Sequence, residues 1–197
     1  MSADESGLGG RLPLYGRKAL DPAQKALYDW LMNVAVPWAD AADFEARTGT
    51  GRLIGPFNPA LLTPDISTAF LDLAVAEQKH TSLSKRSREV IILTVGAVWQ
   101  APYELYAHCA VARYVGHSDD AVRTLADGGL PRELTDEAAV AHRVALALSV
   151  EHRLSEALYR EAEATLGADG VMETVILTGI YHTVCAILNA FEIPAPS

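Results

Sequence analysis

The segment from Ser84 to Gly116 constrains the fold more than any other part of the chain, because it combines helix boundary signals with paired ionisable residues. Ser84 is a suitable N-cap, Pro102 suits the first turn of a helix, and Gly116 suits the position just after a helix ends. Apolar residues recur at helical spacing on both sides of the corner at residues 100–102. The segment therefore predicts two helices joined by a tight turn.

Ionisable residues on these two helices suggest acid–base chemistry. Glu104 and His108 are four residues apart, which places them on one helical face, and a carboxylate beside an imidazole is a common general acid/base near neutral pH. Alone, Glu104 could merely complement the helix dipole and His108 could be an ordinary core histidine. Glu89 could belong to a surface salt-bridge cluster or reach His108 as a buried carboxylate. We expect the Glu104 carboxylate to raise the pKa of His108 more than burial lowers it.

An ordered set of residues carries a resemblance to a known family. Residues 83–89 read L-x-x-R-x-R-E, and a Tyr-Glu pair at 103–104 and His108 follow. This set resembles the carboxymuconolactone decarboxylase family of the alkyl hydroperoxidase D-like superfamily. The similarity covers roughly residues 20–194 and includes Gly-Pro-Phe-Asn at residues 55–58. The resemblance implies an all-α, alkyl hydroperoxidase D-like fold.

The peroxidase branch of that superfamily differs from this chain at its reactive thiols. That branch has a Glu, then Cys-x-x-Cys, then a His, and the pattern aligns with Glu89 and His108 here. Its two cysteines fall on Ala101 and Glu104, so both thiols are missing. The decarboxylase branch is similar in having Tyr-Glu before the His, although Leu105 replaces its usual Trp.

The resemblance implies a cofactor-independent lyase that decarboxylates a small unsaturated or aromatic-derived acid or lactone, or catalyses a related proton shift or isomerisation, in aromatic catabolism or specialised metabolism. His108 would move the proton, Glu104 would orient it, and Glu89 would line the site. Further side chains are candidates for substrate contacts or the pocket wall, namely Arg86, Trp99, Tyr103, Tyr181 and His182. The alternatives are a peroxidase-like oxidoreductase and a non-catalytic binding or assembly protein on the same fold.

The rest of the chain also predicts helices, and no alternating strand pattern competes with them. We expect one domain spanning residues 1–197, in which residues 1–20 form an irregular N-terminal arm. The expected helices cover about residues 23–36, 64–79, 119–126, 136–152, 156–166 and 169–192. Pro37 is expected to stop the first of these, and a long connection with several glycines follows at residues 39–59.

Composition narrows the classes of partner and compartment. The net charge is −9 and no basic run is present, which argues against nucleic acid. No His/Asp/Glu set has zinc spacing, and Cys109 and Cys185 form no metal or redox motif. The chain opens without a secretion signal, so we expect free thiols in a reducing cytoplasm.

The last expected helix bears on membranes and assembly. Its uncharged run at residues 174–191 barely reaches membrane-spanning length and contains Thr, His and Asn, so a buried or interface helix is expected and not a transmembrane one. The family resemblance implies a homo-oligomer, a trimer or hexamer, and we expect this helix or the Ser84–Gly116 pair in the interface.

Overall fold

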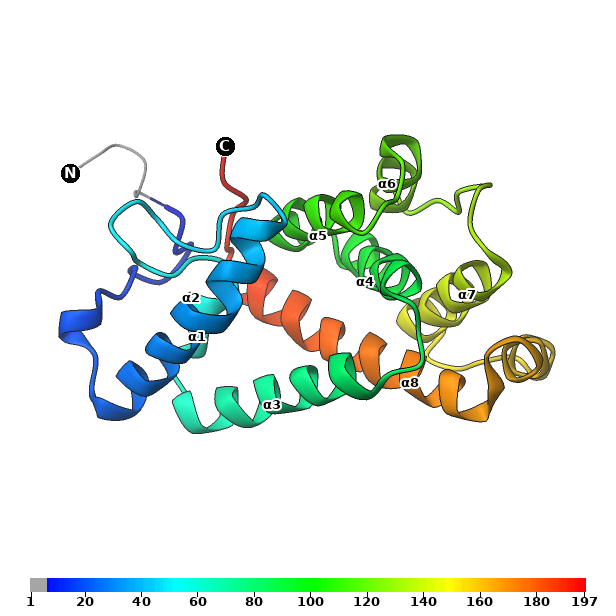
Figure 1. Ribbon diagram of the computed structural model, residues 1–197, viewed down its shortest axis with the longest axis horizontal. Coiled ribbons are helices and arrows are strands. Elements are labelled where there is room, and N and C mark those ends of the chain that lie inside the picture. Colours follow the sequence, from blue (N-terminus) through cyan, green and yellow to red (C-terminus); the bar gives the residue numbers. More distant parts are fainter. Residues whose placement is uncertain (1–6) are drawn as a thin grey trace.

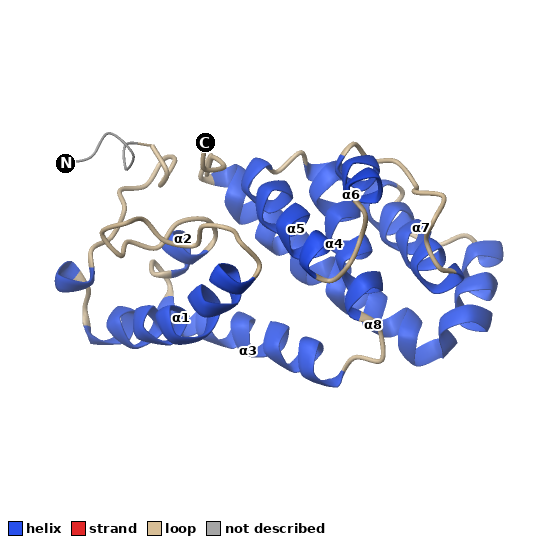
Figure 2. Cartoon of the chain, turned by 45° about the horizontal axis from the view of Figure 1, so that its top comes forward, coloured by secondary structure: helices blue, strands red, loops and turns tan. Residues whose placement is uncertain are grey.

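The structure is a computed structural model that describes residues 7–197, and the secondary structure of this part of the chain is helices joined by loops (Figures 1 and 2). It holds eight α-helices, a short 3-10 helix at Arg17–Ala19 and one isolated antiparallel bridge between Arg47 and Leu53. The all-α prediction is confirmed. In the arm expected at residues 1–20, the 3-10 helix is the one regular element from residue 7 onward, and residues 1–6 lie outside the described residues.

Seven of the eight helices begin where the local sequence predicts helix starts, whereas the short helix Phe57–Ala60 begins inside the connection expected at residues 39–59. Ser84, Ser118, Thr135 and Ser155 each accept a hydrogen bond from the backbone N–H three residues later, as N-caps do. The helices are α1 (Pro22–Ala41), α2 (Phe57–Ala60), α3 (Pro64–His80), α4 (Lys85–Trp99), α5 (Pro102–Tyr114), α6 (Asp119–Ala126), α7 (Asp136–Val150) and α8 (Glu156–Ala190).

Helix α1 extends beyond its expected end, and helix α8 contains an internal break. α1 does not stop at Pro37 but continues through it to Ala41, because Val36 and Ala39 on either side are buried in the core. The packing of these residues outweighs the hydrogen bond that the proline removes. α8 is interrupted at Gly167, whose φ of 72° is not helical, so the two segments expected there are both present.

Helix α4 is the centre of the fold. Nearly every residue from Ser87 to Gly96 is buried, and α4 contacts α5, α6, α7 and α8 (Figure 1). A helix that is apolar around its whole circumference can be stable only in such surroundings. Glu89 lies inside this buried run, so the fold carries a carboxylate into the interior.

The long connection between α1 and α2 is held against α5 by two tyrosines. The Tyr103 hydroxyl donates to the Glu45 carbonyl oxygen at 2.6 Å, and the Tyr106 hydroxyl accepts from the Glu45 N–H at 3.0 Å. The ring of Tyr103 is fully buried against Gly55, which has a φ of 62°. Tyr103, a candidate substrate contact in the sequence, is thus a packing residue that fixes this loop.

Helix α8 has the length and composition to cross a membrane, and no other helix among residues 7–197 does. It contacts α4, α5 and α7 and is interrupted at Gly167. A helix in the core of a helical protein can have the same length and the same apolar composition. The expectation of a buried or interface helix agrees with this packing.

The close approach of Gly55 and Tyr103 gives a stability prediction. A Cβ atom at residue 55 would overlap the ring carbons of Tyr103, and the positive φ disfavours any L side chain. Gly55→Ala should therefore destabilise the fold by about 3 kcal/mol or more in chemical denaturation. Gly49→Ala in the same loop is the matched control, since its Cβ would meet nothing within 4 Å. Equal stability of the two variants would contradict this packing.

Candidate active site

The imidazole of His108 lies between two buried carboxylates that come from different helices. Its Nδ1 donates to Glu89 Oε2 on α4 at 2.8 Å, and its Nε2 lies 3.4 Å from Glu104 Oε1 on its own helix, α5. The side chains of all three residues are less than 9% exposed. The structure therefore favours the buried carboxylate for Glu89 over the surface cluster, and makes it the closer partner of His108.

One oxygen of Glu104 has no hydrogen-bond partner. Glu104 Oε1 is buried, and although His108 Nε2 is within ion-pair distance, the contact lacks the geometry of a hydrogen bond. Buried polar atoms are nearly always paired, so an unpaired carboxylate oxygen indicates a position for a proton or for a polar group of a ligand.

The ionisation of the cluster follows from burial and from the three neighbouring charges. Burial raises the pKa of Glu104 to about 7; Glu89 adds to this shift and His108 opposes it. Burial lowers the pKa of His108, but Glu89 and Glu104 together outweigh burial, so that the His108 pKa is raised overall. The shift has the direction expected from the sequence, and Glu89 is the carboxylate that contributes most to it. Both His108 and Glu104 therefore hold a proton to a higher pH than the free side chains do.

Two aromatic rings enclose the imidazole. Tyr181 on α8 meets it edge-on, with ring centroids 5.0 Å apart, and Trp38 on α1 lies 6.0 Å away. Sequence reasoning missed Trp38 because Pro37 was expected to end the helix. The apolar stripe of α1 could have found it, since Leu27, Leu31 and Trp38 recur at helical spacing.

A buried ion pair lies next to the cluster. Arg88, the residue before Glu89, contacts Glu77 Oε2 at 2.6 Å, and the two side chains are 11% and 4% exposed. The other oxygen of Glu77 has no partner, and burial raises the pKa of Glu77 while Arg88 opposes the shift. The charge of Arg88 also acts on His108 and on Tyr181, so it contributes to the field of the site.

The other candidate substrate contacts lie apart from this cluster. Arg86 is exposed, and its carbonyl oxygen lies 3.0 Å from Nε2 of His117. Trp99 and His182 contact each other with ring centroids 5.9 Å apart, and Nε2 of His182 lies 2.8 Å from Ser149 Oγ. Within residues 7–197 no hydrogen bond, ion pair or ring contact joins these three residues to His108.

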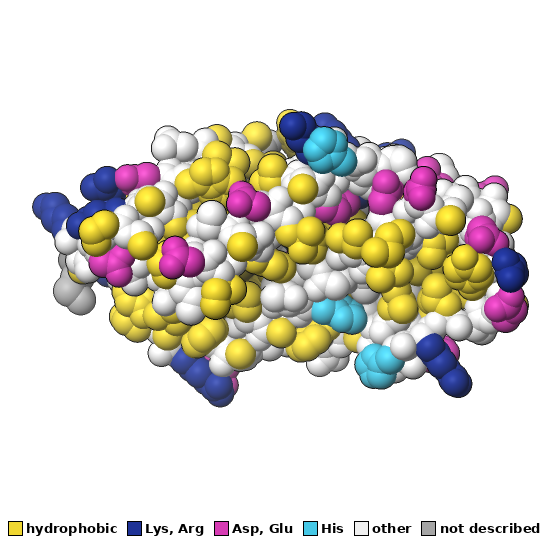
Figure 3. Space-filling model, turned by 90° about the horizontal axis from the view of Figure 1, so that it is seen from below, with side chains coloured by type: hydrophobic (Ala, Val, Ile, Leu, Met, Phe, Trp, Pro, Cys, Tyr) yellow, Lys and Arg dark blue, Asp and Glu magenta, His cyan; other side chains and the backbone are white. Residues whose placement is uncertain are grey.

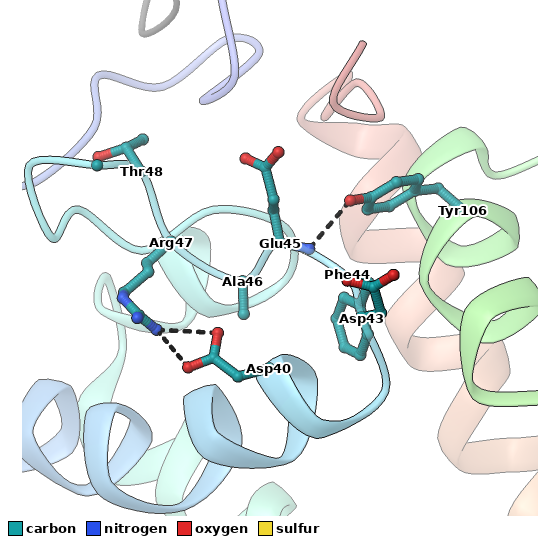
Figure 4. A pocket seen from close by; sticks show the side chains of 9 residues that line it. Asp40, Asp43, Phe44, Glu45, Ala46, Arg47, Thr48 and Tyr106 are labelled. Carbon is teal, nitrogen blue, oxygen red and sulfur yellow. Dashed lines mark hydrogen bonds and ion pairs between the residues drawn. The ribbon is translucent and has the colours of Figure 1, made fainter. Parts of the chain in front are cut away.

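An open groove of about 420 Å³ lies between α5 and the loop after α1 (Figure 4). Its lining is acidic, with Asp40, Asp43 and Glu45, and Arg47 pairs with Asp40 at 3.0 Å. None of the candidate site residues lines it. Its wall includes Phe44, whose ring centroid lies 5.1 Å from that of Trp38, and Trp38 in turn contacts the ring of His108.

Metal coordination has no candidate in the described part of the chain. No three His, Cys, Asp or Glu side chains of residues 7–197 are grouped so that they could hold a metal ion.

Comparison with solved structures identifies the fold. An uncharacterised peroxidase-related protein with an alkylhydroperoxidase AhpD core, from Ralstonia eutropha JMP134, matches with a TM-score of 0.73 and 17% identity over 94% of this chain and 91% of its own. A peroxidase-related protein from Silicibacter sp. TM1040 matches with a TM-score of 0.69 and 16% identity over 95% and 92%. The chain has an alkylhydroperoxidase D-like fold.

A third structure with this fold belongs to an enzyme with a different activity. The debrominase Bmp8, in complex with 2,3,4-tribromopyrrole, matches with a TM-score of 0.69 and 14% identity over 90% of this chain and 91% of its own. No protein-family model and no curated protein matches the sequence. At these identities the likeness establishes the fold, and the chemistry must be argued from the site.

The buried carboxylate predicts a pH dependence of stability. A carboxyl whose pKa rises to about 7 on folding binds protons more tightly in the folded state, so stability falls as pH rises from about 4.5 to 7. The raised pKa of His108 likewise makes the folded state less stable as the pH rises. Glu104→Gln should therefore gain stability relative to the wild type across this window, by on the order of 2 kcal/mol. Urea denaturation at several pH values measures the free energy of unfolding of both proteins.

The exposed Glu151 provides the control for this comparison, since Glu151→Gln should follow the wild type at every pH. If Glu104→Gln and the wild type change in parallel between pH 4.5 and 7, Glu104 does not titrate as described.

Proposed function

We propose that the chain is a cofactor-independent enzyme of the carboxymuconolactone decarboxylase type, which uses His108 and Glu104 for decarboxylation or a related proton shift on a small unsaturated or aromatic-derived acid or lactone. One observation carries the proposal: Glu89 fixes one nitrogen of a buried imidazole, and the other nitrogen faces a carboxyl with a pKa of about 7. A general acid is most effective when its pKa lies near the working pH.

The reaction needs a proton donor and stabilisation of negative charge. When the bond between the carboxylate carbon and its neighbour breaks, carbon dioxide leaves and the electron pair remains as an enolate-like anion. The His108 imidazolium stabilises this charge and delivers a proton to the carbon. Glu104 lies one turn away and can return a proton to His108, while Glu89 holds the ring in one orientation.

For substrate attraction we propose Arg88 in place of Arg86. Arg86 is exposed, whereas Arg88 is buried beside the cluster and makes its ion pair with only one oxygen of Glu77. A guanidinium in this position favours an anionic substrate, and its planar fork suits a carboxylate. Tyr181, edge-on to His108, would pack against the apolar part of the substrate.

Support for a small planar substrate comes from a structural neighbour. The debrominase of this fold is bound to a tribromopyrrole, a small planar heterocycle. Enclosure of His108 by the rings of Trp38 and Tyr181 provides flat apolar surfaces of the kind that such a molecule would contact.

A thiol-dependent peroxidase is the weaker alternative. Its two cysteine positions hold Ala101 and Glu104, and burial raises the pKa of both Cys109 and Cys185. A reactive cysteine requires a lowered pKa, because the thiolate is the nucleophile. Free thiols of this kind suit a reducing cytoplasm, where we place the enzyme.

The proposal predicts that His108 is required for the chemical step. His108→Ala should lower the rate of carbon dioxide release roughly a hundredfold or more, the usual scale for a lost general acid. The assay measures carbon dioxide from a panel of unsaturated acids and lactones, without added thiol, metal or flavin. His152→Asn is the control, because His152 is exposed and its positive φ suits Asn. Wild-type turnover in His108→Ala would leave the binding-protein alternative as the better one.

Glu104→Gln should change the pH dependence of the same reaction. The substitution removes a negative charge that raises the pKa of His108, so the imidazolium persists only to a lower pH. The alkaline limb of kcat against pH should move to lower pH while the fold remains intact. An unmoved limb would show that Glu104 does not act on the catalytic proton.

The two cysteines should be dispensable. A Cys109→Ala, Cys185→Ala variant should keep its turnover, and neither this variant nor the wild type should reduce hydroperoxides with a dithiol. Peroxide turnover by the wild type that disappears in a folded double variant would favour the peroxidase alternative.

A further inference from the structure

Helix α3 has little contact with the core although much of its sequence is apolar. Only Glu77 is buried among its 17 residues, and its main contacts are with α1 and α8. Ile66 is 72% exposed, Leu73 48% and Val75 42%. A helix that exposes this much apolar surface usually has a partner.

The exposed residues of α3 form a regular seam. They recur with alternating steps of four and three, starting just before the helix, and all of them are exposed, namely Leu62, Ile66, Ala69, Leu73, Ala76 and His80. This is the a/d pattern of two helices that pack along their length. At about 1.5 Å per residue the helix offers a contact roughly 25 Å long.

The apolar surface is visible on the face to which α3 belongs. α3 runs along the lower edge of the molecule in Figure 1, and the view from below in Figure 3 shows hydrophobic side chains spread along that face, with basic side chains toward its margins and some acidic ones among the hydrophobic ones. On α8, Met172 is 58% exposed and Val175 37%, and between them Glu173 binds Ser82 just beyond the end of α3. The apolar surface therefore continues past the C-terminal end of the seam.

We propose that this seam binds the same helix of a second copy of the chain, antiparallel and about a two-fold axis. Charge distribution favours this occupant: Asp65 lies in the first turn of α3, whereas Lys79 and His80 lie in its last turn. An antiparallel pair places Asp65 of each helix near the basic end of the other, and it also opposes their dipoles favourably.

Side-chain size favours the same pairing. Ile66 and Leu73 alternate along the seam with Ala69 and Ala76, so each large residue of one copy can pack over a small residue of the other. A membrane is a poorer occupant, because the chain carries a net charge of −9 and the seam is flanked by few basic residues.

The pairing would act on the interior through Glu77. That residue projects from the inner side of α3 onto Arg88, so a partner helix on the outer side would hold the buried ion pair in place. The seam differs from the interfaces expected from the sequence, which were the last helix and the Ser84–Gly116 pair.

Sedimentation equilibrium at micromolar concentration tests the seam. The wild type should form an even-numbered oligomer, and Leu73→Glu should have half its mass, because two charges would be buried at the two-fold contact. Leu130→Glu is the matched control, since Leu130 is 46% exposed and lies outside the seam; it should keep the wild-type mass. A monomeric or trimeric wild type, or a Leu73→Glu variant of unchanged mass, would overturn the proposal.

Disulfide cross-linking tests the orientation in a Cys109→Ser background. An Ile66→Cys variant mixed with an Ala76→Cys variant should form a disulfide-linked pair on oxidation, whereas neither variant should do so alone. Cross-linking of each variant with itself would mean a parallel pair and would contradict the antiparallel arrangement. Binding of a monomeric wild type to anionic vesicles would assign the face to a membrane and would likewise overturn the proposal.

Discussion

The contact between Glu89 and His108 is the interaction on which the site depends. It joins α4 to α5 inside the core, at 2.8 Å, where a charge without a partner would be strongly destabilising. A second carboxylate, Glu104, lies on the other side of the ring, so the buried cluster holds more potential negative charge than one imidazolium can balance. The raised pKa values of Glu104 and His108 favour a bound proton in the cluster, and a bound proton is what acid–base chemistry requires.

The fold provides what this cluster needs in three ways. The middle of α4 is buried and surrounded by other helices, so Glu89 is carried to a place where its side chain is only 8% exposed. The corner before Pro102 turns the chain back, so that α5 lies along α4 with His108 facing Glu89. Trp38 and Tyr181 then close the remaining sides with aromatic rings. Proton transfer and exclusion of water thus have a common origin in the packing around α4.

The sequence predicted those parts of the fold that have local signals. N-cap serines and threonines, Pro102 and the helical spacing of Glu104 and His108 are all short-range features, and the helices and the paired residues are found where they indicate. Pro37 was misread, because the local penalty for a proline in a helix was weighed without the buried residues beside it. That error hid Trp38.

The choice between Arg86 and Arg88 could not be made locally either. The two residues lie two positions apart at the start of α4, and only the position of α3, which brings Glu77 against Arg88, separates a mostly buried guanidinium from an exposed one. Trp99 and His182 likewise pair with each other through the packing of α4 against α8. Contacts between elements distant in the chain decide which candidates reach the site, and no short-range pattern encodes them.

The protonation state of His108 is the central claim, and nitrogen-15 NMR of the labelled ring tests it most directly. The account predicts that the His108 pKa lies above the ordinary value for histidine in the wild type, because the carboxylates outweigh burial. In Glu89→Gln, burial should prevail over the single remaining carboxylate and lower the pKa relative to the wild type. A His108 ring that is neutral at pH 7 in the wild type, with a pKa unchanged in Glu89→Gln, would contradict the account.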